Sequence, residues 1–414
     1  MKNTNIQTLK GFRDFLPQEK RQRNFVQSKI VEVFEKFGFE PLETPTLESA
    51  DLLLGKYGAE ADKLVFNFED RGGRQIGLRY DQTVPTARVL AQYQNELPKY
   101  FRRYQIQNTF RAEKPQKGRY REFTQCDIDI FGSQSPVADA EIIACTYFSF
   151  ANVGFKNIKL KINDRQVLFE TLSPFATNQV SVLSIIQTID KLDKLESTQV
   201  IQELIAKGVQ SSQAQKILIA IAQAQISENL QAIIQAVVDL GVPKSAIEFS
   251  PSLARGLDYY TGMIFEVSLA DYSAGSCGGG GRYDNLINQL GGIDIPAVGI
   301  AFGFDRMVEA ANQLNLIPME TEGTSVLVTI FDQNLQNLSL QTANYLRNKG
   351  IKTEVFPSIE KLNKQLKYAN QKNIPWVIMI GDQEAQAQQI TLKNMNSGEQ
   401  EKLSIDQAVE KISK

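Results

Sequence analysis

Arginine and carboxylate side chains gather in one short stretch of the sequence. Arg111 and Glu113 lie two residues apart, and Arg119 and Arg121 follow within ten residues. An arginine guanidinium binds phosphate through two parallel hydrogen bonds and keeps its charge when it is partly buried. Glu113 could orient Arg111 or accept a hydrogen bond from an adenine amino group. The stretch suggests a nucleotide phosphate site, and a surface hairpin held by salt bridges is the alternative.

A second group of polar residues could bind a ligand with nitrogen donors. Gln125 and Asp129 lie four residues apart on one face of a predicted strand. Burying them costs free energy unless something hydrogen-bonds to them. An ammonium or imidazole ligand would satisfy both, and pairing with neighbouring Arg or Lys side chains is the alternative. Asp81 and Thr83 lie just before a predicted helix. Either residue could simply cap that helix, or Asp81 could bind the amino group of a substrate.

Two further segments combine arginine with tyrosine or with a helix start. Residues 255–262 read RGLDYYTG. Arg255 could stabilise charge that develops on a phosphorus atom, and the hydroxyl groups of Tyr259 and Tyr260 could bind a polar ligand. A turn before an ordinary strand is the alternative. Arg306 lies near the start of a predicted helix, where anions are attracted, although it could be a solvated surface residue.

A glycine run at Gly278–Gly281 precedes Arg282 and Tyr283. Backbone without side chains can approach a ligand closely, and a flexible loop explains the run equally well. No GK[ST] follows the glycines, so the run is not a Walker loop. A preceding strand and the GxGxxG spacing are also missing, so it is not a dinucleotide-binding fingerprint.

The sequence of 414 residues contains no histidine. Serine-hydrolase triads, zinc hydrolases with histidine ligands and phosphotransfer through histidine are therefore excluded. Acid–base and electrostatic chemistry must come from carboxylates, Arg, Lys, Tyr or the substrate itself. The three cysteines, Cys126, Cys145 and Cys277, form no CxxC pair. Neither a zinc site nor a disulfide framework is expected, and a reducing cytoplasmic compartment fits best.

Two strands must position the polar residues between 103 and 131. In 103–111 the odd positions are polar, and in 123–131 Gln125, Asp127 and Asp129 share one face. Such alternation predicts an antiparallel hairpin with one polar face, joined by a long basic connection at 112–121. Apolar spacing predicts a helix at 18–37, and 39–44 reads as extended up to Pro45. Other predicted elements of this part are a hairpin at 64–68 and 75–80, helices at 83–94 and 139–152, strands at 156–162 and 259–267, and a strand end feeding a helix at 300–314.

The length predicts more than one domain. Residues 166–248 are rich in helical patterns without a chemical motif and look like an inserted helical module, with helices at 180–192, 198–206, 213–224 and 230–240. Pro318–Gly323 is a plausible linker. Beyond it, strands at 326–330, 352–355 and 376–380 alternate with helices at 335–349 and 359–371, which predicts a parallel α/β domain. We expect domains at 1–323, interrupted by 166–248, and at 324–414.

Composition is that of a globular protein, with 42% hydrophobic residues, 22% charged residues and a net charge of −2. No apolar run approaches the roughly 20 residues that span a bilayer, so we expect no membrane partner. The first fifteen residues are polar and include Arg13 and Asp14, so no secretory signal is expected. Local basic patches could still bind nucleic acid phosphates.

The order of these segments resembles class II aminoacyl-tRNA synthetases. Arg111, Glu113 and Arg119 are similar to their motif 2, Arg306 before a helix to motif 3, and the helix at 18–37 with its extended continuation to motif 1. The segments RGLDYYTG (255–262) and GGGGRYDNL (278–286) resemble the two signatures of histidyl-tRNA synthetases. PQKGRYREF (115–123) strengthens that resemblance, which covers the whole chain.

The resemblance implies a role for each candidate. Asp81 and Gln125 would bind the histidine α-amino group beside Thr83, Asp129 and Tyr260 would each bind one imidazole nitrogen, and Tyr259 and Tyr283 would complete the pocket. Arg111 would hold the α-phosphate and the amino acid carboxylate. Glu113 would face adenine, and Arg119 and Arg306 would hold the outer phosphates. Arg255 would be the catalytic cation and would also belong to the histidine-binding residues, so Arg255 and Arg111 are the expected catalytic residues.

The resemblance also implies the reaction and its partners. Histidine and ATP would give histidyl-adenylate and pyrophosphate, and the acyl group would pass to the terminal ribose of tRNA(His). Mg²⁺ would bridge the outer phosphates, with no protein side chain assigned as its ligand. The fold would be an α+β catalytic domain with a mixed, mainly antiparallel sheet, a helical insertion near the tRNA acceptor arm and a C-terminal α/β anticodon-binding domain. A homodimer is expected. The basic residues that could meet tRNA phosphates in the C-terminal part are Lys349, Lys352, Lys361, Lys364, Lys367 and Lys372.

Two positions depart from the family pattern: residues 112 and 124, often histidine in the family, are Ala112 and Thr124. Neither is an expected ligand. The absence of histidine from an enzyme expected to act on histidine has three open explanations. Its synthesis could escape histidine starvation, the sequence could be engineered, or the absence could be due to chance. If the protein and a variant with several His codons restored accumulate equally in starved cells, the first explanation is excluded.

Two rival functions share parts of this pattern. The regulatory subunit of ATP phosphoribosyltransferase has the catalytic fold without the activity, but it typically lacks the C-terminal domain and an intact RGLDYY segment. Both features are present here. A pseudo-enzyme that senses uncharged tRNA inside a larger kinase is the second rival, and the sequence contains no kinase motif.

Overall fold

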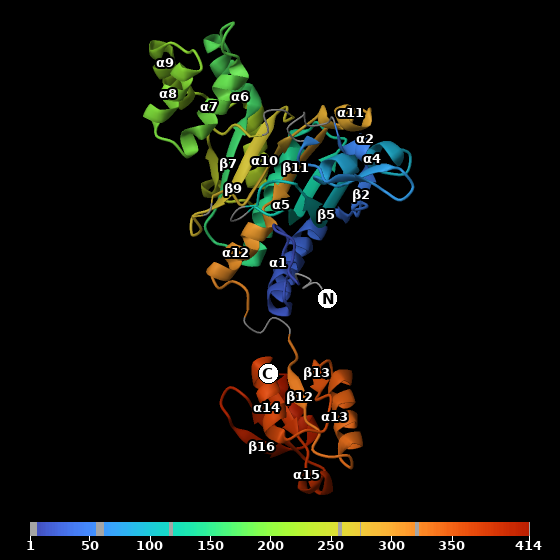
Figure 1. The fold of residues 1–414 in the computed structure, drawn as a ribbon. Helices are drawn as coiled ribbons and strands as arrows, with labels where there is room; N and C mark the ends of the chain where they lie inside the picture. The colour runs from blue at the N-terminus through green and yellow to red at the C-terminus, as the bar shows by residue number, and fades with distance from the viewer. Residues whose placement is uncertain are drawn as a thin grey trace. The chain divides into compact units, whose positions relative to one another are not determined.

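A computed structural model describes residues 6–54, 62–115, 119–255, 259–273, 275–318 and 323–413. The chain forms two compact units, Met1–Ile317 and Pro318–Lys414 (Figure 1). The linker predicted at Pro318–Gly323 lies mostly outside the described residues. Within the described ranges, every helix is too short or too polar to cross a lipid bilayer.

An eight-stranded sheet in the order β1-β5-β6-β11-β10-β9-β7-β8 forms the centre of the first unit. Neighbouring strands run antiparallel except for β1 with β5 and β7 with β8. The predicted mixed, mainly antiparallel sheet is therefore confirmed. The strands are β1 (Glu40–Pro41), β5 (Phe101–Phe110), β6 (Glu122–Phe131), β7 (Ile158–Asp164), β8 (Ile247–Phe249), β9 (Met263–Leu269), β10 (Gly278–Arg282) and β11 (Ala297–Phe302).

The hairpin β5–β6 has the polar face that the alternation predicts. Its register pairs Arg103 with Asp129, Gln105 with Asp127 and Gln107 with Gln125. The opposite face of β6 carries Cys126, Ile128 and Ile130, which belong to the main hydrophobic core. The polar face is not solvated, because Arg103, Gln105, Asp127 and Asp129 are all buried. Polar groups buried in this way need partners, and this need shapes the site described below.

Helices cover the apolar face of the sheet. Val26, Ile30, Val33 and Phe34 line one side of α1 (Pro17–Lys36) and pack in the main core. The helix begins with a proline at its first position, where the missing N–H is not needed. The other helices whose buried residues join this core are α5 (Pro136–Val153), α10 (Glu228–Asp239) and α12 (Phe304–Gln313).

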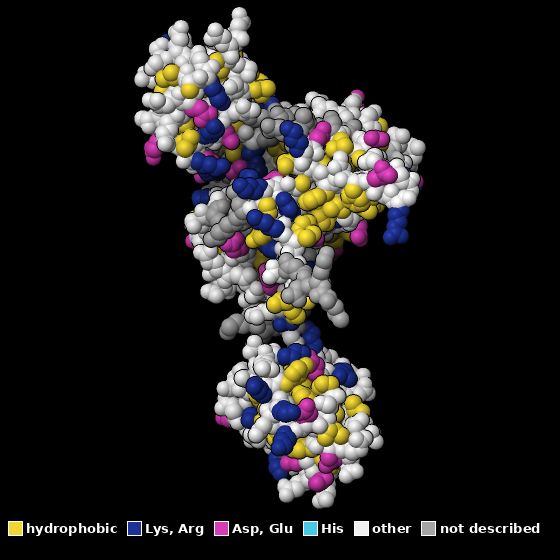
Figure 2. Space-filling view, viewed as in Figure 1, with side chains coloured by type: hydrophobic (Ala, Val, Ile, Leu, Met, Phe, Trp, Pro, Cys, Tyr) yellow, Lys and Arg dark blue, Asp and Glu magenta, His cyan; other side chains and the backbone are white. Residues whose placement is uncertain are grey.

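A small sheet and three short helices flank the polar face at one end. The predicted hairpin exists as β3 (Asn67–Glu69) and β4 (Gln75–Leu78), and β2 (Leu47–Ser49) adds an unpredicted third strand in the order β2-β4-β3. The helices here are α2 (Ala50–Leu53), α4 (Thr83–Gln92) and α11 (Leu286–Gly291). Hydrophobic side chains gather on the surface near β2 and β5 (Figure 2).

The region predicted as a helical insertion, 166–248, is helical but not uniform. Its first four helices form a lobe at the far end of the sheet (Figure 1) and belong to a second hydrophobic core. The fifth helix, α10, packs with α5 in the main core, and β8 joins the main sheet. The elements before α10 are α6 (Arg165–Leu172), η1 (Ser173–Phe175), α7 (Val182–Ile189), η2 (Asp190–Asp193), α8 (Ser197–Ala206) and α9 (Ser211–Ala222), and η3 (Lys244–Ala246) follows it.

The glycine run forms the interior strand β10 and is not a flexible loop. A Cβ on Gly280 would overlap the Gly299 carbonyl oxygen of the neighbouring strand β11. A Cβ on Gly279 would overlap the guanidinium of Arg255. The run therefore makes room both for close strand packing and for an arginine lying against the sheet. The predicted strand 259–267 is shifted, because β9 begins at Met263.

The C-terminal unit is built on a five-stranded sheet, β13-β12-β14-β15-β16. Three parallel strands fit the predicted alternation: β12 (Val326–Val328), β13 (Thr353–Val355) and β14 (Trp376–Met379). An unpredicted antiparallel hairpin, β15 (Ile390–Asn394) and β16 (Gln400–Leu403), extends it, so the sheet is mixed rather than parallel. The helices are α13 (Gln336–Asn348), α14 (Leu362–Gln371), α15 (Asp382–Ala387) and α16 (Ile405–Ile412).

Replacing Gly280 by alanine should lower the free energy of unfolding by about 2 kcal/mol or more, because the new methyl group meets backbone that cannot move aside. Gly278→Ala is the matched control on the same strand, since its Cβ would lie 3.3 Å from the nearest heavy atom. The control should lose less than about 1 kcal/mol. Urea unfolding of both variants measures the difference, and equal losses would contradict the close approach of β10 and β11.

Candidate active site

Two adjoining pockets open over the polar face of the sheet. The first, of about 440 Å³, contains four arginines and is called the arginine pocket. The second, of about 380 Å³, contains three aspartates and is called the acidic pocket. Arg111, Gln125 and Ala301 line both, so the pockets meet along one edge. The site thus places a cationic compartment directly beside an anionic one.

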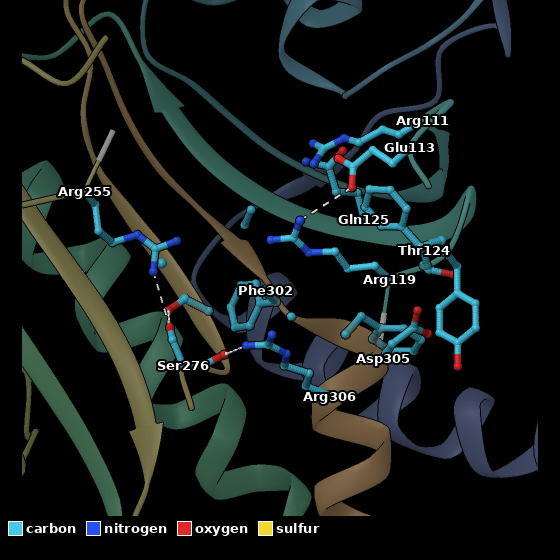
Figure 3. A pocket seen from close by; sticks show the side chains of 17 residues that line it. Arg111, Glu113, Arg119, Thr124, Gln125, Arg255, Ser276, Phe302, Asp305 and Arg306 are labelled. Carbon is cyan, nitrogen blue, oxygen red and sulfur yellow. Dashed lines mark hydrogen bonds and ion pairs between the residues drawn. The ribbon is translucent and has the colours of Figure 1, made fainter. Parts of the chain in front are cut away.

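The arginine pocket brings together residues that are far apart in the sequence. Arg111 follows β5, Arg119 lies in the connection to β6, Arg255 precedes β9 and Arg306 lies in the first turn of α12. Figure 3 shows Arg119 and Arg255 pointing toward one another across the cavity. Four guanidinium groups against two lining carboxylates, Glu113 and Asp305, make the pocket suited to a polyanion.

Aromatic rings and backbone carbonyls hold two of these arginines. The Arg111 guanidinium carbon lies 4.4 Å from the ring centre of Tyr80 and 5.1 Å from that of Phe123. The Arg306 guanidinium donates to the carbonyl oxygen of Ser276 at 2.7 Å. Contacts with rings and carbonyls restrict the motion of both arginines without neutralising their charge, so both can still bind an anion.

Arg255 is held by a residue to which sequence reasoning gave no role. Its guanidinium donates to the carboxylate of Glu266 on β9 and to the Ser276 hydroxyl at 3.3 Å. Gly279 leaves the space in which it lies. Arg255 lines the arginine pocket and not the acidic pocket, although the prediction also included it among the histidine-binding residues. Gly256, Leu257 and Asp258 of the same segment lie outside the described residues.

Glu113 and Asp305 are not equivalent carboxylates. Asp305 is paired with Arg13 at 2.9 Å and with Arg23 at 2.5 Å. Glu113 lies 3.8 Å from Arg119, with a quarter of its side chain exposed. Glu113 is therefore more available to a ligand than Asp305. Arg23 also donates to the hydroxyl of Thr124, at 2.8 Å, so Thr124 has a structural contact here.

The acidic pocket gathers most of the predicted histidine-binding residues. Asp81 and Asp129 are buried and Gln125 is half-buried. The Oε1 atom of Gln125 is buried without a hydrogen-bond partner among the described residues. A buried, unsatisfied acceptor suits a ligand that donates. The predicted residues that line the pocket are Asp81, Thr83, Arg111, Gln125, Asp129, Tyr259, Tyr260 and Tyr283.

Asp81 has both of the uses that the sequence left open. Its Oδ1 atom accepts from the backbone N–H of Val84 at 3.1 Å and so caps the start of α4. The same side chain lines the acidic pocket and is only 8% exposed. The cap fixes the carboxylate in place at the pocket wall.

Asp129 already has protein partners. Its Oδ2 atom lies 2.7 Å from a guanidinium nitrogen of Arg103, and the hydroxyl of Tyr283 donates to its Oδ1. Asp129 is therefore paired with a neighbouring arginine, which was the alternative left open by the sequence. The pKa of Asp129 is raised, because the effect of burial exceeds the opposing effects of Arg103 and of the Tyr283 hydrogen bond. Gly299 faces Asp129 across the strand pair and leaves room for its carboxylate.

A buried polar network supports Arg103. Its guanidinium donates to the side-chain oxygens of Gln105 at 3.1 Å and Gln82 at 3.4 Å. Gln105 in turn donates to the Thr44 hydroxyl at 2.9 Å. Arg103 was recognised as part of the polar face but was given no role. The register of the hairpin brings Arg103 opposite Asp129. A shift of one residue would turn one of the two side chains to the other face and destroy the pair.

No group of three or more Cys, Asp or Glu side chains suited to a metal occurs within the described parts of the chain. The three cysteines are buried and free. The arrangement therefore offers charge, hydrogen bonds and orientation. It can hold an anionic, phosphate-bearing molecule beside a small molecule with cationic or donor nitrogens, and bring the two together at Arg111 and Gln125.

The fold and the site define a class II aminoacyl-tRNA synthetase with a C-terminal anticodon-binding domain. A family model described as histidyl-tRNA synthetase matches residues 11–307, and one described as anticodon binding domain matches residues 315–414. The chain belongs to the histidyl-tRNA synthetase family.

Individual relatives support the same family. The chain is 37% identical to the histidine--tRNA ligase of Cytophaga hutchinsonii, over 97% of this chain and 98% of that protein. The crystal structure of histidyl-tRNA synthetase from Nostoc sp. PCC 7120 superposes with a TM-score of 0.87 at 30% identity, covering 99% of both chains. These matches confirm the predicted family and the predicted class of enzyme.

The rival function has weaker support. A Bacillus halodurans structure titled ATP phosphoribosyltransferase regulatory subunit/histidyl-tRNA synthetase has a TM-score of 0.74, covering 91% of this chain and 99% of that one. At 20% identity this likeness shows the shared fold alone.

Replacing Arg103 by methionine should lower the free energy of unfolding by about 3–5 kcal/mol, because it leaves the buried carboxylate of Asp129 without its cation. The matched control is Arg102→Met, on the opposite face of the same strand. Arg102 pairs with Glu141 and is one-third exposed, so its loss should cost about 1 kcal/mol or less. Guanidinium chloride unfolding compares the two, and similar losses would show that the Arg103 pair does not stabilise the fold.

Proposed function

We propose that this chain activates L-histidine with ATP, giving histidyl-adenylate and pyrophosphate, and then transfers histidine to the 3'-terminal ribose of tRNA(His). The observation that carries the proposal is the shared edge of the two pockets, where Arg111 and Gln125 line both. The proposed reaction joins the histidine carboxylate to the α-phosphate of ATP, and the shared edge is where the two groups can meet. The family to which the chain belongs supports the same reaction.

The acidic pocket is proposed to bind histidine. Asp81 and Gln125 would accept from its α-ammonium group beside Thr83, because Gln125 has a buried acceptor that no described residue satisfies. Asp129 and Tyr260 would each bind one imidazole nitrogen. Tyr259 and Tyr283 would enclose the ring. A pocket that hydrogen-bonds both ring nitrogens can reject analogues lacking them by roughly 10⁴-fold.

The arginine pocket is proposed to bind ATP. Arg111 would contact the α-phosphate and the histidine carboxylate from the shared edge, Glu113 would face adenine, and Arg119 and Arg306 would hold the outer phosphates. Arg255 would stabilise the charge that develops at the α-phosphorus as the carboxylate attacks. No protein nucleophile is needed, because the reaction depends on positioning and on positive charge.

Mg²⁺ is proposed to accompany ATP. Mg²⁺ prefers phosphate and water oxygens with one or two carboxylates. The ion would be held mainly by phosphate and water oxygens, since Asp305 is already paired with Arg13 and Arg23 and Glu113 is proposed to face adenine. When bound, the ion would neutralise charge on the outer phosphates.

The rest of the chain is proposed to bind tRNA. The C-terminal domain, taken as residues 324–414, would bind the anticodon, and the insertion at 166–248 would approach the acceptor arm of tRNA held by the catalytic domain of 1–323. Of the C-terminal lysines, Lys364 and Lys372 are paired with Glu360 and Glu354, so their charges are partly compensated. A cytoplasmic location is proposed from the free cysteines and from the role of the family in translation.

A homodimer is also proposed. Leu47 on β2 and Phe68 on β3 are 44% and 47% exposed, and Leu16 just before α1 is 70% exposed. Apolar surface near motif 1 could be covered by a second copy about a two-fold axis.

Pyrophosphate exchange tests the proposed activity. The purified protein, given ATP, labelled pyrophosphate and each standard amino acid in turn, should exchange label with histidine only. Asp129→Ala and Arg255→Ala should each abolish the exchange, because one removes the imidazole contact and the other the cation at the α-phosphorus. Lys191→Ala, which breaks a surface ion pair with Glu203, is the control and should keep the exchange rate. Exchange with a different amino acid, or with none, would refute the proposal.

Sedimentation equilibrium tests the proposed dimer. The protein should have twice the chain mass of 46.4 kDa. A Leu47→Asp, Phe68→Asp variant should shift toward the single-chain mass, because charge placed in an apolar interface is costly to bury. A wild-type protein that sediments at the single-chain mass at micromolar concentration would exclude the dimer.

A further inference from the structure

Asp127 is a buried carboxylate of the acidic pocket that has no role in the mechanism above. It lies between Gln125 and Asp129 on the polar face of β6 and is only 4% exposed. Its Oδ1 atom is buried without a hydrogen-bond partner among the residues the structure describes. Buried acceptors are nearly always satisfied in native proteins, so this atom points to a missing donor.

The two strand neighbours of Asp127, both within the described part of the chain, do not supply that donor. Gln105 lies opposite Asp127 on β5, but its amide nitrogen donates to the Thr44 hydroxyl at 2.9 Å and to Gln107 at 2.5 Å. On the other side, the partner on β11 is Ala301, which has no polar side-chain atom. The donor must therefore enter from the pocket, which both Asp127 and Ala301 line.

Burial opposes the ionisation of Asp127 in the free protein, and the surrounding charges act in both directions. The pKa of Asp127 is raised to about 8, chiefly by burial and also by Asp129 and Asp81, while Arg103 and Arg111 lower it. Arg103 is already ion-paired with Asp129. The titratable and charged groups that face Asp127 are Arg103 on β5, Asp129 on β6, Asp81 and Arg111 at the pocket wall, and Tyr259.

We propose that Asp127 binds the α-ammonium group of histidine as a carboxylate, together with Asp81 and Gln125. An ammonium group has three N–H donors, and these side chains offer it three acceptors in one pocket. Asp129 is less suited to this contact, because its carboxylate forms an ion pair with Arg103 and its Oδ1 atom accepts from Tyr283.

The contact is coupled to a proton. The protonated carboxyl of free Asp127 loses its proton to the solvent when the cationic ammonium enters, and the bound pair is a carboxylate with an ammonium. Free protein at pH 7 holds this proton on most molecules, because the pKa of Asp127 is about 8. Histidine binding at pH 7 should therefore release close to one proton per site.

Calorimetry tests the coupling on the unmodified protein. Histidine is titrated at pH 7 into the protein in MOPS and in Tris buffer, whose ionisation enthalpies differ. The binding enthalpies should differ by the amount expected for close to one released proton. Equal enthalpies in the two buffers would overturn the inference, whatever any variant does.

Asp127→Asn tests the residue assignment. It should abolish the buffer dependence and raise the KM for histidine by roughly 10–100-fold, while the KM for ATP stays within about twofold. A general disturbance of the fold would change both constants. The control ligand is 3-(imidazol-4-yl)propanoate, which lacks the amino group and should bind the variant as well as it binds the unmodified protein. An unchanged histidine KM, or equal weakening of both ligands, would contradict the assignment.

This inference rests on the proposed function, and the two can fail separately. Exchange of pyrophosphate with histidine by the unmodified protein tests the function. If exchange occurs but no proton is released and Asp127→Asn behaves normally, only the role of Asp127 is lost.

Discussion

The burial of a polar strand face is the constraint on which the site depends. Strands β5 and β6 turn their hydrocarbon side chains toward α1 and α5, so their charged and amide groups must lie on the opposite, also buried, face. Buried charges are stable only when they are paired, and Arg103 with Asp129 is such a pair. The network through Gln105 and Thr44 satisfies further groups. Gln125 and Asp127 each have a buried acceptor without a hydrogen-bond partner among the described residues, and a ligand with N–H donors fits there.

A second constraint separates the charges of the two pockets. Strand β10 has no side chains at its first four positions, so Arg255 can lie against it, held by Glu266 from β9. Positive charge therefore collects on one side of Arg111 and negative charge on the other. Two oppositely charged pockets that share an edge hold an anionic nucleotide beside a cationic amino acid before any reaction occurs. This arrangement lowers the entropic cost of bringing the two reactants together.

Much of this could be predicted from the sequence because the relevant patterns are local. Period-two alternation predicted the polar face of β5 and β6, and apolar spacing predicted α1 within a residue at each end. The order of Arg111, Arg255 and Arg306 in the family motifs predicted that they meet, and all three line one pocket. The lining of the acidic pocket by Asp81, Gln125 and Asp129 was also expected.

The remaining features depend on contacts that no local pattern encodes. Pairing of Glu266 with Arg255 and of Arg103 with Asp129 requires the strand register, which sequence spacing alone does not give. Glycine is disfavoured in strands, so the strand β10 was not predicted from its composition. The packing of α10 in the main core likewise depends on a surface of α5 that is distant in the sequence.

The most direct test of the account is a crystal structure of the protein with histidine and a non-hydrolysable ATP analogue. The account predicts the phosphates among Arg111, Arg119, Arg255 and Arg306, the imidazole in the acidic pocket, and the histidine carboxylate at the shared edge beside Arg111. Histidine bound among the four arginines, or an acidic pocket left empty while the nucleotide is bound, would contradict it.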